Sequence, residues 1–325
     1  MRRTRTLTAL TTAAALALVA GCGAAGEQAG GGAEKAGAKG AVSVPDIKGE
    51  QKLDKPAKKV VALEWTYAED LLALGVQPAG VAEKKLYGEW VKGGPDLDKS
   101  VKDVGTRQEP SLETIKALKP DLIVTSKLRS AGNYKQLKKI APTLMYDPYA
   151  TKSEYEEMRS TFKHLATATG KEKEADKALA DMDAKIAKAK KRIAGAKKDG
   201  EEFTVGRGYS TDGAATIEVL GDSTIPGALV PKLGLKQGWK GKPDAYGMSK
   251  VDVEGLKPAE KSNFAYVAAP KDDVFKKSMP KNKLWKDLDF VKKDKVYPLD
   301  PGTWFFGGPF STAMAADEIA KSLDS

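Results

Sequence analysis

One long amphipathic helix in the middle of the chain constrains the fold more than any other feature. Between Lys171 and Lys198 the sequence consists mainly of Ala, Lys, Glu and Asp. Its apolar positions recur every three or four residues, at Ala175, Leu179, Met182, Ile186, Ala189 and Ile193. This period predicts one helix of about 25 residues, about 38 Å long, with a single buried face. Gly195 and Gly200 close it.

Short apolar runs alternate with amphipathic helical stretches on both sides of this helix. Before it, the pattern predicts strands at 59–63 and 122–125 and helices at 68–74, 111–118 and 154–168. After it, apolar segments follow at 203–205, 225–233, 253–256, 264–268 and 296–299, with a final helix at 311–323. Such alternation is typical of α/β lobes with parallel strands. We therefore predict an N-terminal α/β lobe over 44–170, a bridging helix over 171–199 and a C-terminal α/β lobe over 200–325.

A weak internal repeat supports two related lobes. In the first lobe, the stretch from Ser111 to Asp121 leads into the apolar run that starts at Leu122, and in the second, the stretch from Val251 to Pro258 leads into the run at Phe264. Each stretch has a Glu at a predicted helix start, Glu113 and Glu254. Taken alone, this placement is explained by the favourable position of an acidic side chain near a helix N-terminus, typically about 0.3–1 kcal/mol.

The N-terminus reads as a secretory signal followed by an attachment point. A basic stretch precedes an apolar run from Leu7 to Ala20, which is too short to span a bilayer as a mature helix, and the small residues after it end in the only cysteine, Cys22. This arrangement resembles the bacterial lipobox, in which the signal, here 1–21, is removed and the thiol is acylated. Residues 22–43 then form the lipidated Cys and a flexible linker of Gly, Ala, Lys, Glu and Ser, because this composition cannot bury a core.

Composition excludes several classes of function. The chain of 325 residues has one His and one Cys, too few for a zinc, copper or haem site built on such ligands. After residue 21 the net charge falls from +10 to +7, carried mainly by dispersed Lys without Arg-rich or basic-aromatic blocks, so we expect no nucleic-acid partner. No later segment has the roughly 18 consecutive apolar residues of a transmembrane helix. We expect contact with the membrane through the lipid anchor alone.

Several motifs together resemble the ferric-siderophore binding proteins, and more narrowly those of the ferric-hydroxamate (ferrichrome) type and their Gram-positive lipoprotein relatives. The resemblance runs from about residue 55 to the C-terminus, is dense in the first lobe and is thin over 200–235. It is carried by Val61–Trp65, Glu69–Pro78, Gly80–Ala82, Trp90, Asp103–Pro110, Leu112–Glu113, Lys119–Asp121, Trp239, Tyr246 and Trp304–Gly307.

This resemblance implies a substrate-binding lipoprotein of an ABC importer. The implied fold is α/β, with two Rossmann-like lobes that have central sheets and are joined by one long α-helix, the class III periplasmic-binding-protein fold. The ligand would lie in the cleft between the lobes. The resemblance also implies a monomer that is no enzyme, lipid-anchored on the extracytoplasmic face of the cell membrane, with a ferric siderophore and an ABC transporter permease as its partners.

Arginines are the first candidates for ligand contact. An iron(III) siderophore brings its own oxygen ligands, so the protein needs no metal-binding side chains or cofactor, only donors toward oxygen and apolar faces. Arg suits this task because its planar fork of donors engages two oxygens and stacks on aromatic rings. After the signal, Arg159 and Arg192 lie on predicted polar helix faces, whereas Arg107, Arg129 and Arg207 follow strands, where open α/β sheets bind ligands. Arg107 matches the ligand arginine of the family; Arg129 stands where the hydroxamate proteins have an aromatic residue, and Arg207 has no clear counterpart.

Aromatic and acidic residues complete the predicted sites. The expected siderophore-binding aromatics are Trp65, Trp90, Tyr209, Trp239, Tyr246, Trp304 and Phe306. For each Trp, core packing is the alternative. Trp285 is interpreted as a helix packing residue. In the importers of this family, one acidic residue on each lobe docks onto the permease, and the resemblance assigns this role to Glu113 and Glu254.

Three other functions remain open from the sequence. A cobalamin- or haem-binding lipoprotein of the same fold is the main alternative, because such carriers share the architecture. An exported hydrolase is less favoured: the only histidine, His164, lies on a predicted helix, and no Gly-x-Ser-x-Gly motif or phosphate-binding glycine loop is present. A structural envelope protein is a third option. Three cleft arginines favour an oxygen-rich chelate but do not separate hydroxamates from carboxylates or catecholates.

Overall fold

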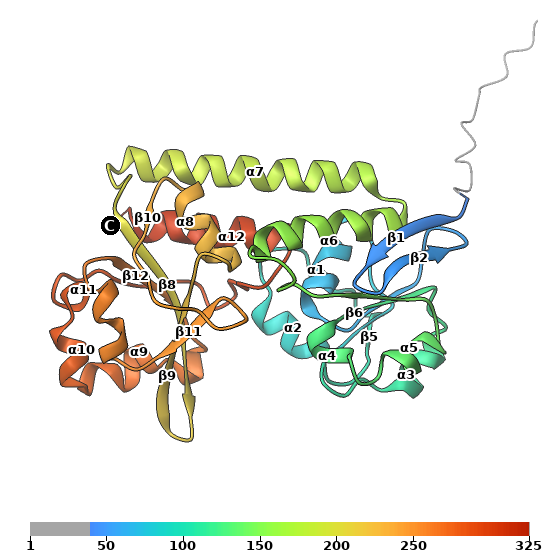
Figure 1. Ribbon diagram of the computed structural model, residues 1–325, viewed down its shortest axis with the longest axis horizontal. Helices are drawn as coiled ribbons and strands as arrows, with labels where there is room; N and C mark the ends of the chain where they lie inside the picture. The colour runs from blue at the N-terminus through green and yellow to red at the C-terminus, as the bar shows by residue number, and fades with distance from the viewer. Residues whose placement is uncertain (1–39, 325) are drawn as a thin grey trace, which may run out of the picture. The chain divides into compact units, whose positions relative to one another are not determined.

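The computed structural model describes residues 40–324, which build two α/β halves linked by one long helix (Figure 1). The predicted signal, Cys22 and most of the linker lie outside these residues. The long helix is α7, Glu172–Gly195, 24 residues instead of the predicted 25 or so. It ends where Lys197 and Gly200 take left-handed backbone angles, φ of 58° and 76°.

The first half contains a parallel sheet. A short antiparallel hairpin, β1 with β2, precedes it. The sheet has the order β5-β4-β3-β6-β7, and all its strand pairs are parallel. The elements are β1 Val42–Asp46, β2 Gly49–Leu53, β3 Val60–Ala62, α1 Trp65–Ala73, β4 Gly80–Val81, α2 Lys84–Trp90, β5 Lys102–Asp103, α3 Leu112–Leu118, β6 Leu122–Ser126, α4 Lys127–Ser130, α5 Tyr134–Lys138, β7 Thr143–Tyr146 and α6 Glu154–Thr169.

The second half contains a mixed sheet in the order β11-β9-β8-β12-β13, with β10 also pairing with β8. Strands β8, β12 and β13 are parallel, as expected, but β9 runs antiparallel to both β8 and β11. The elements are β8 Glu202–Thr211, β9 Ala214–Leu220, α8 Ile225–Lys232, β10 Lys236–Gln237, β11 Met248–Val251, η1 Glu254–Ala259, β12 Asn263–Val267, η2 Pro270–Asp272, α9 Val274–Lys277, η3 Met279–Lys281, α10 Lys283–Asp287, α11 Asp289–Lys292, β13 Val296–Pro298 and α12 Pro309–Ser322, where η marks 3-10 helices.

The strands are apolar on both faces because helices cover both sides of each sheet. In β3, Val60 and Ala62 belong to the largest core cluster, while Val61 belongs to a separate cluster with Ile115 of α3 and Leu137 of α5. In β12 the same alternation sends Ala265 into the largest cluster and Phe264 into a cluster with α9–α11. Each sheet therefore has one face of its own and one face in a common core.

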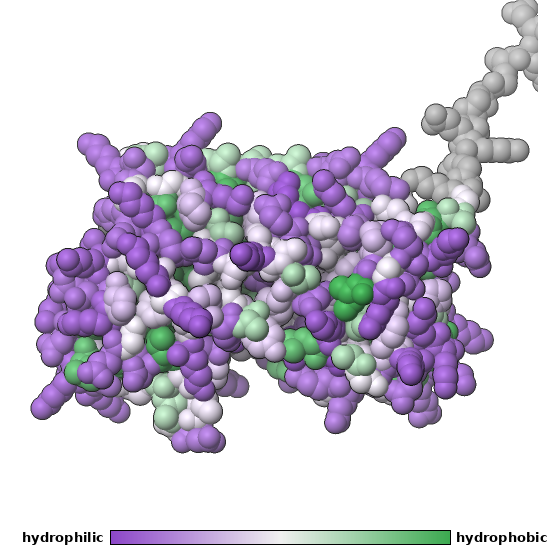
Figure 2. Space-filling model, viewed as in Figure 1, coloured by the Kyte–Doolittle hydropathy of each residue, from purple (hydrophilic) through white to green (hydrophobic). Residues whose placement is uncertain are grey.

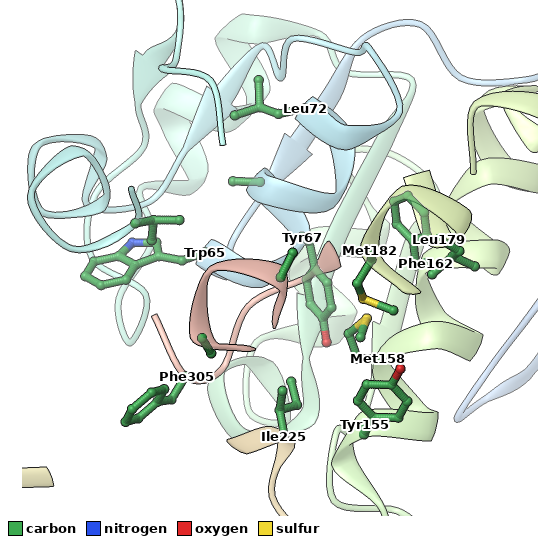
Figure 3. Packing of buried hydrophobic residues seen from close by; sticks show 14 of the residues in the cluster. Trp65, Tyr67, Leu72, Tyr155, Met158, Phe162, Leu179, Met182, Ile225 and Phe305 are labelled. Carbon is green, nitrogen blue, oxygen red and sulfur yellow. The ribbon is translucent and has the colours of Figure 1, made fainter. Parts of the chain in front are cut away.

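Helices from both halves build this common core. Helix α7 packs over α12 and α6 (Figure 1), and its predicted apolar stripe is buried in full. Figure 3 shows Leu179 and Met182 of α7 with Phe162 and Met158 of α6. The two halves are thus joined by a shared apolar layer as well as by one covalent link.

A carboxyl group of α1 holds the start of α12. Glu69 is fully buried and accepts hydrogen bonds from Ser311 N at 2.8 Å and from the Ser311 hydroxyl. The neighbouring Asp70 lies against Gly308, where a Cβ atom would overlap Asp70 Oδ1. A larger residue at 308 would therefore have to displace the buried Asp70 carboxylate.

Most of the face shown in Figure 2 is hydrophilic, as the Lys-rich composition leads one to expect. No helix within residues 40–324 combines the length and apolar composition needed to cross a bilayer.

Candidate functional site

A cavity of about 400 Å³ lies between the two halves. Its first-lobe wall comes from the carboxyl ends of β3, β6 and β7 and from α1 and α6, with Arg129, Tyr149 and Met158 among its residues. Its other wall comes from the second half, with Arg207 and Tyr246. The carboxyl edge of a parallel sheet is the usual place for a ligand in open α/β folds.

Two of the predicted arginines meet at one carboxylate of the first lobe. Glu64 follows β3, and its Oε1 accepts from Arg107 Nη1 at 2.9 Å while its Oε2 accepts from Arg129 Nε at 2.8 Å. Arg107 Nε also donates to Glu83 Oε2 at 2.8 Å. The side chains of Arg107 and Arg129 are 14% and 21% exposed and both line the cavity. Nη2 of Arg107 and both Nη atoms of Arg129 have no hydrogen-bond partner within residues 40–324.

Aromatic rings hold Arg107 in place. Its guanidinium lies 3.8 Å from the centre of the Trp65 ring and 6.0 Å from that of Trp304, and the two rings are 4.9 Å apart. Such cation–π stacking fixes the plane of the guanidinium. Trp65 is itself 3% exposed, donates to the Ala82 carbonyl and does not line the cavity.

The third arginine lies within a strand and not in a loop as predicted. Arg207 is in the middle of β8, opposite Glu218 of β9, with which it forms an ion pair. The strand is longer than the run at 203–205 because it forms a hairpin with β9. Arg207 still faces the cavity, and its guanidinium lies 5.1 Å from the centre of the Phe306 ring.

The sequence profile of the periplasmic binding proteins matches residues 60–303, which is most of the chain and both lobes. The chain belongs to the periplasmic binding protein family. This is a family of non-catalytic substrate-binding proteins, and the two-lobe fold with a long linking helix agrees with the architecture that the sequence predicted.

Known relatives align with this periplasmic binding protein over most of its length. The Fe(3+)-citrate-binding protein YfmC of Bacillus subtilis is 29% identical, over 94% of this chain and 93% of the relative. The iron(3+)-hydroxamate-binding protein YxeB of the same organism is 30% identical, over 79% and 78%. The crystal structure of the siderophore binding protein FhuD from Vibrio cholerae, bound to Fe3+–Desferal, has a TM-score of 0.73 and 30% identity, covering 82% of this chain and 98% of that one.

Three of the predicted aromatic residues of this binding protein line the cavity: Trp304, Phe306 and Tyr246. The Thr66 hydroxyl donates to the Phe306 carbonyl, which ties that loop to α1. Tyr209 lies behind Arg207 and donates to Glu218 Oε1 at 2.8 Å.

Two predicted tryptophans lie away from the cavity lining. Trp239 is 6% exposed, packs in the second-lobe core and donates to the Ser249 hydroxyl. Trp90 ends α2 and packs partly buried against the common core. The packing role expected for Trp285 is confirmed, because it is buried among the aromatic residues of the second lobe.

Several lining residues were not singled out in the sequence. Tyr149 packs edge-on against Tyr246 of the other lobe, with 5.1 Å between ring centres, and Leu128 is 53% exposed at the cavity. Glu64 was missed although it adjoins Trp65. A Glu directly after a buried strand and before a helix is a signal that was available for Glu64, whereas nothing local indicates that Tyr149 meets Tyr246.

Two buried acids also border the cavity. Glu154 of α6 accepts from Ile225 N of α8 at 3.1 Å, across the lobes, and burial raises its pKa to about 8. Asp70 has no hydrogen-bond partner among the described residues for either carboxylate oxygen, and burial raises its pKa well above the usual range. In both groups burial favours the neutral acid over the carboxylate.

The remaining predicted residues lie outside the cavity. Glu113 is exposed in the first turn of α3 and Glu254 is exposed at the start of η1. The strands that follow, β6 and β12, each take the second place from the edge of their sheet. His164 lies on α6 with its ring stacked on Tyr146, and burial lowers its pKa.

Proposed function

We propose that this protein is an extracytoplasmic substrate-binding lipoprotein that captures a ferric siderophore and delivers it to the permease of an ABC importer. The observation that carries the proposal is the inter-lobe cavity, where three arginines stand among aromatic and aliphatic side chains. Guanidinium groups donate to the oxygens around the iron, and the apolar surfaces contact the organic backbone. The iron is cargo, held by ligands that the siderophore supplies.

We favour a siderophore of the hydroxamate type. Relatives of similar identity are named for ferric citrate and for ferric hydroxamate, so these names support a ferric chelate without selecting one. The hydroxamate type is favoured by the first-lobe motifs and by the likeness to the structure bound to Fe3+–Desferal.

Within the cavity we assign ligand contact to Arg107, Arg129, Arg207, Tyr246 and the pair Trp304 and Phe306. Trp65 and Tyr209 are positioning residues: the first stacks under Arg107 and the second shares Glu218 with Arg207. Trp90 and Trp239 do not line the cavity, and for them we propose no ligand contact.

The proposal is tested by titrating residues 23–325 with iron(III) complexes while tryptophan fluorescence is recorded. Because Trp304 lines the cavity, saturable quenching is expected with ferrioxamine or ferrichrome. Catecholate and citrate complexes, cobalamin and haem form the comparison set. Tight binding of cobalamin or haem, without saturable quenching by any ferric siderophore, would refute the proposal.

The exposed acids are proposed as the contact with the permease. Glu113 and Glu254 occupy corresponding positions before β6 and β12, so they present one carboxylate on each lobe. A charge pair of this kind orients the protein on its partner. The double variant Glu113→Ala with Glu254→Ala should bind ligand normally and impair uptake, and normal uptake by this variant would remove the assignment.

The anchor is proposed from the sequence pattern around Cys22. Acylation of that thiol would place the protein on the extracytoplasmic face of the cell membrane. The predicted end of the linker at residue 43 is wrong by two residues, because the folded body already begins with β1 at Val42, where Val42 and Ser43 pair with β2.

A further inference from the structure

One carboxylate stands at the centre of the arginine donors in the cavity. Glu64 bridges Arg107 and Arg129 and is 14% exposed, and it lines the cavity together with both arginines. Glu83 pairs with Arg107 as well but is not among the lining residues. An oxygen atom of a ligand that accepts from these guanidinium groups therefore comes close to Glu64.

The arginines do not give the cavity a positive charge, because each already has a carboxylate partner. Arg107 and Arg129 face Glu64 and Glu83, and Arg207 faces Glu218. Glu157 also lines the cavity, while the buried Asp70 and Glu154 have raised pKa values that favour their neutral forms. With the ion-pair partners Glu83 and Glu218 counted, the carboxylates offset the charge of the three guanidinium groups, so the site is rich in N–H donors without a net positive charge.

We infer that Glu64 is a specificity-determining residue that selects the charge of the ferric chelate, disfavouring multiply anionic complexes relative to uncharged or cationic ones. The inference rests on the proposed function, since it concerns the ligand of the same cavity. An oxygen atom of an uncharged ferric hydroxamate complex shares the arginine donors with Glu64, whereas an additional carboxylate on the ligand is repelled by it. At a separation near 10 Å in a partly exposed site, one such charge changes affinity by roughly five- to ten-fold per unit of ligand charge.

The remaining donors make this sharing possible. Arg129 uses only Nε toward Glu64, so both of its Nη groups have no protein partner among the hydrogen bonds of residues 40–324. Arg107 uses Nη1 and Nε and keeps Nη2. A neutral ligand is bound without displacing Glu64, and Glu64 continues to fix the direction of both guanidinium groups.

The test compares the dissociation constants of three iron(III) complexes: cationic ferrioxamine B, uncharged ferrichrome and an anionic citrate complex in citrate excess. The readout is the ratio of the constants for the anionic and cationic complexes, so a general loss of affinity cancels. Glu64→Gln should shift this ratio at least about ten-fold toward the anionic complex. Glu64→Asp keeps the charge and should keep the wild-type ratio. The matched control Glu83→Gln removes a charge that does not line the cavity and should shift the ratio less than Glu64→Gln does.

The outcomes separate the two proposals. Wild-type protein that binds none of the three complexes refutes the inference, and if it binds no other ferric siderophore either, the proposed function is refuted as well. Wild-type protein that binds, with Glu64→Gln moving all three constants alike or Glu83→Gln moving the ratio as far, refutes the inference alone. If Glu64→Gln does not fold, Arg129→Gln provides the opposite test: it should shift the ratio toward the cationic complex, and an unchanged ratio overturns the inference.

Discussion

The burial and hydrogen bonding of a side chain in this protein depend on residues that are close in space but distant in sequence. Glu154 shows this most clearly. It begins α6 in the first lobe, yet its side chain accepts from the first turn of α8 in the second, and it is 5% exposed. An acidic residue in the first turn of one helix therefore forms a buried contact between the lobes.

Replacement of Glu154 by Gln should change how stability depends on pH. Burial raises the pKa of Glu154 from 4.5 to about 8. Below about pH 4.5 the acid is protonated in both the folded and unfolded states, and its stabilising contribution is complete; as pH rises toward 8, the unfolded state loses the proton first and stability falls. Glu154→Gln removes this loss and still accepts from Ile225, so the variant should gain on the order of 3 kcal/mol relative to wild type between about pH 5 and 8.5.

Urea unfolding of both proteins across this pH range is the measurement. The curves of unfolding free energy against pH should converge in acid and separate in base. Parallel curves would show that Glu154 titrates normally and that burial does not control it.

At the scale of elements, the predictable parts are those with a strong period. The stripe from Ala175 to Ile193 predicted α7 and is buried throughout, and the apolar runs near β3, β6 and β12 predicted their strands. The hairpin of β8 and β9 was missed. Its turn at Asp212 and Gly213, with φ of 50° and 80°, is flanked by Ser, Thr and Ala, so the apolar alternation that marks a strand is weak there.

The site was predictable to the extent that its residues follow strands. Arg107 and Arg129 could be placed at the sheet edge because parallel strands end on one side. Their shared partner Glu64 and the contact of Tyr149 with Tyr246 could not, because they depend on which strands are neighbours and on how the lobes face each other.

Helix α7 should contribute to the stability of both lobes at once. Met182 is 1% exposed in the common core, and Figure 3 places it beside Met158 of α6. Met182→Ala should lower the free energy of unfolding by about 2–5 kcal/mol, because it leaves a cavity between helices. Lys185→Ala, on the exposed face of the same helix, should stay within about 0.5 kcal/mol of wild type.

The free energy of unfolding is measured by chemical denaturation, monitored in parallel by far-UV circular dichroism and by tryptophan fluorescence. Both probes should shift together for Met182→Ala, since the core is shared. A shift confined to one probe would mean that the lobes unfold independently of α7.

At the scale of the whole folded body, the shared core limits motion between the lobes. Apolar residues of both sheets belong to one cluster with α1, α6, α7, α8 and α12. Hydrogen bonds also cross between the lobes, from Glu154 N to the Ser223 carbonyl at 2.7 Å and from Ser311 to Glu69. We therefore expect ligand to bind to a largely preformed cavity.

Small-angle X-ray scattering of residues 23–325 with and without ferrioxamine tests this rigidity. The radius of gyration should change by less than about 1 Å. A larger decrease on binding would show that the lobes close around the ligand and would contradict the expected rigidity.

Binding of a ferric siderophore in the arginine-lined cavity is tested by one paired titration. The dissociation constant of ferrioxamine or ferrichrome is measured for wild type, Arg107→Ala and Arg192→Ala. Arg192 is the control because it forms ion pairs on the outer part of α7, with Asp317 and Asp324, and does not line the cavity. Because Arg107→Ala removes a charged hydrogen bond, this variant should bind the complex about ten- to a hundred-fold more weakly than wild type. Arg192→Ala should bind it as tightly as wild type does. Equal affinity of all three proteins would contradict binding of the siderophore in this cavity.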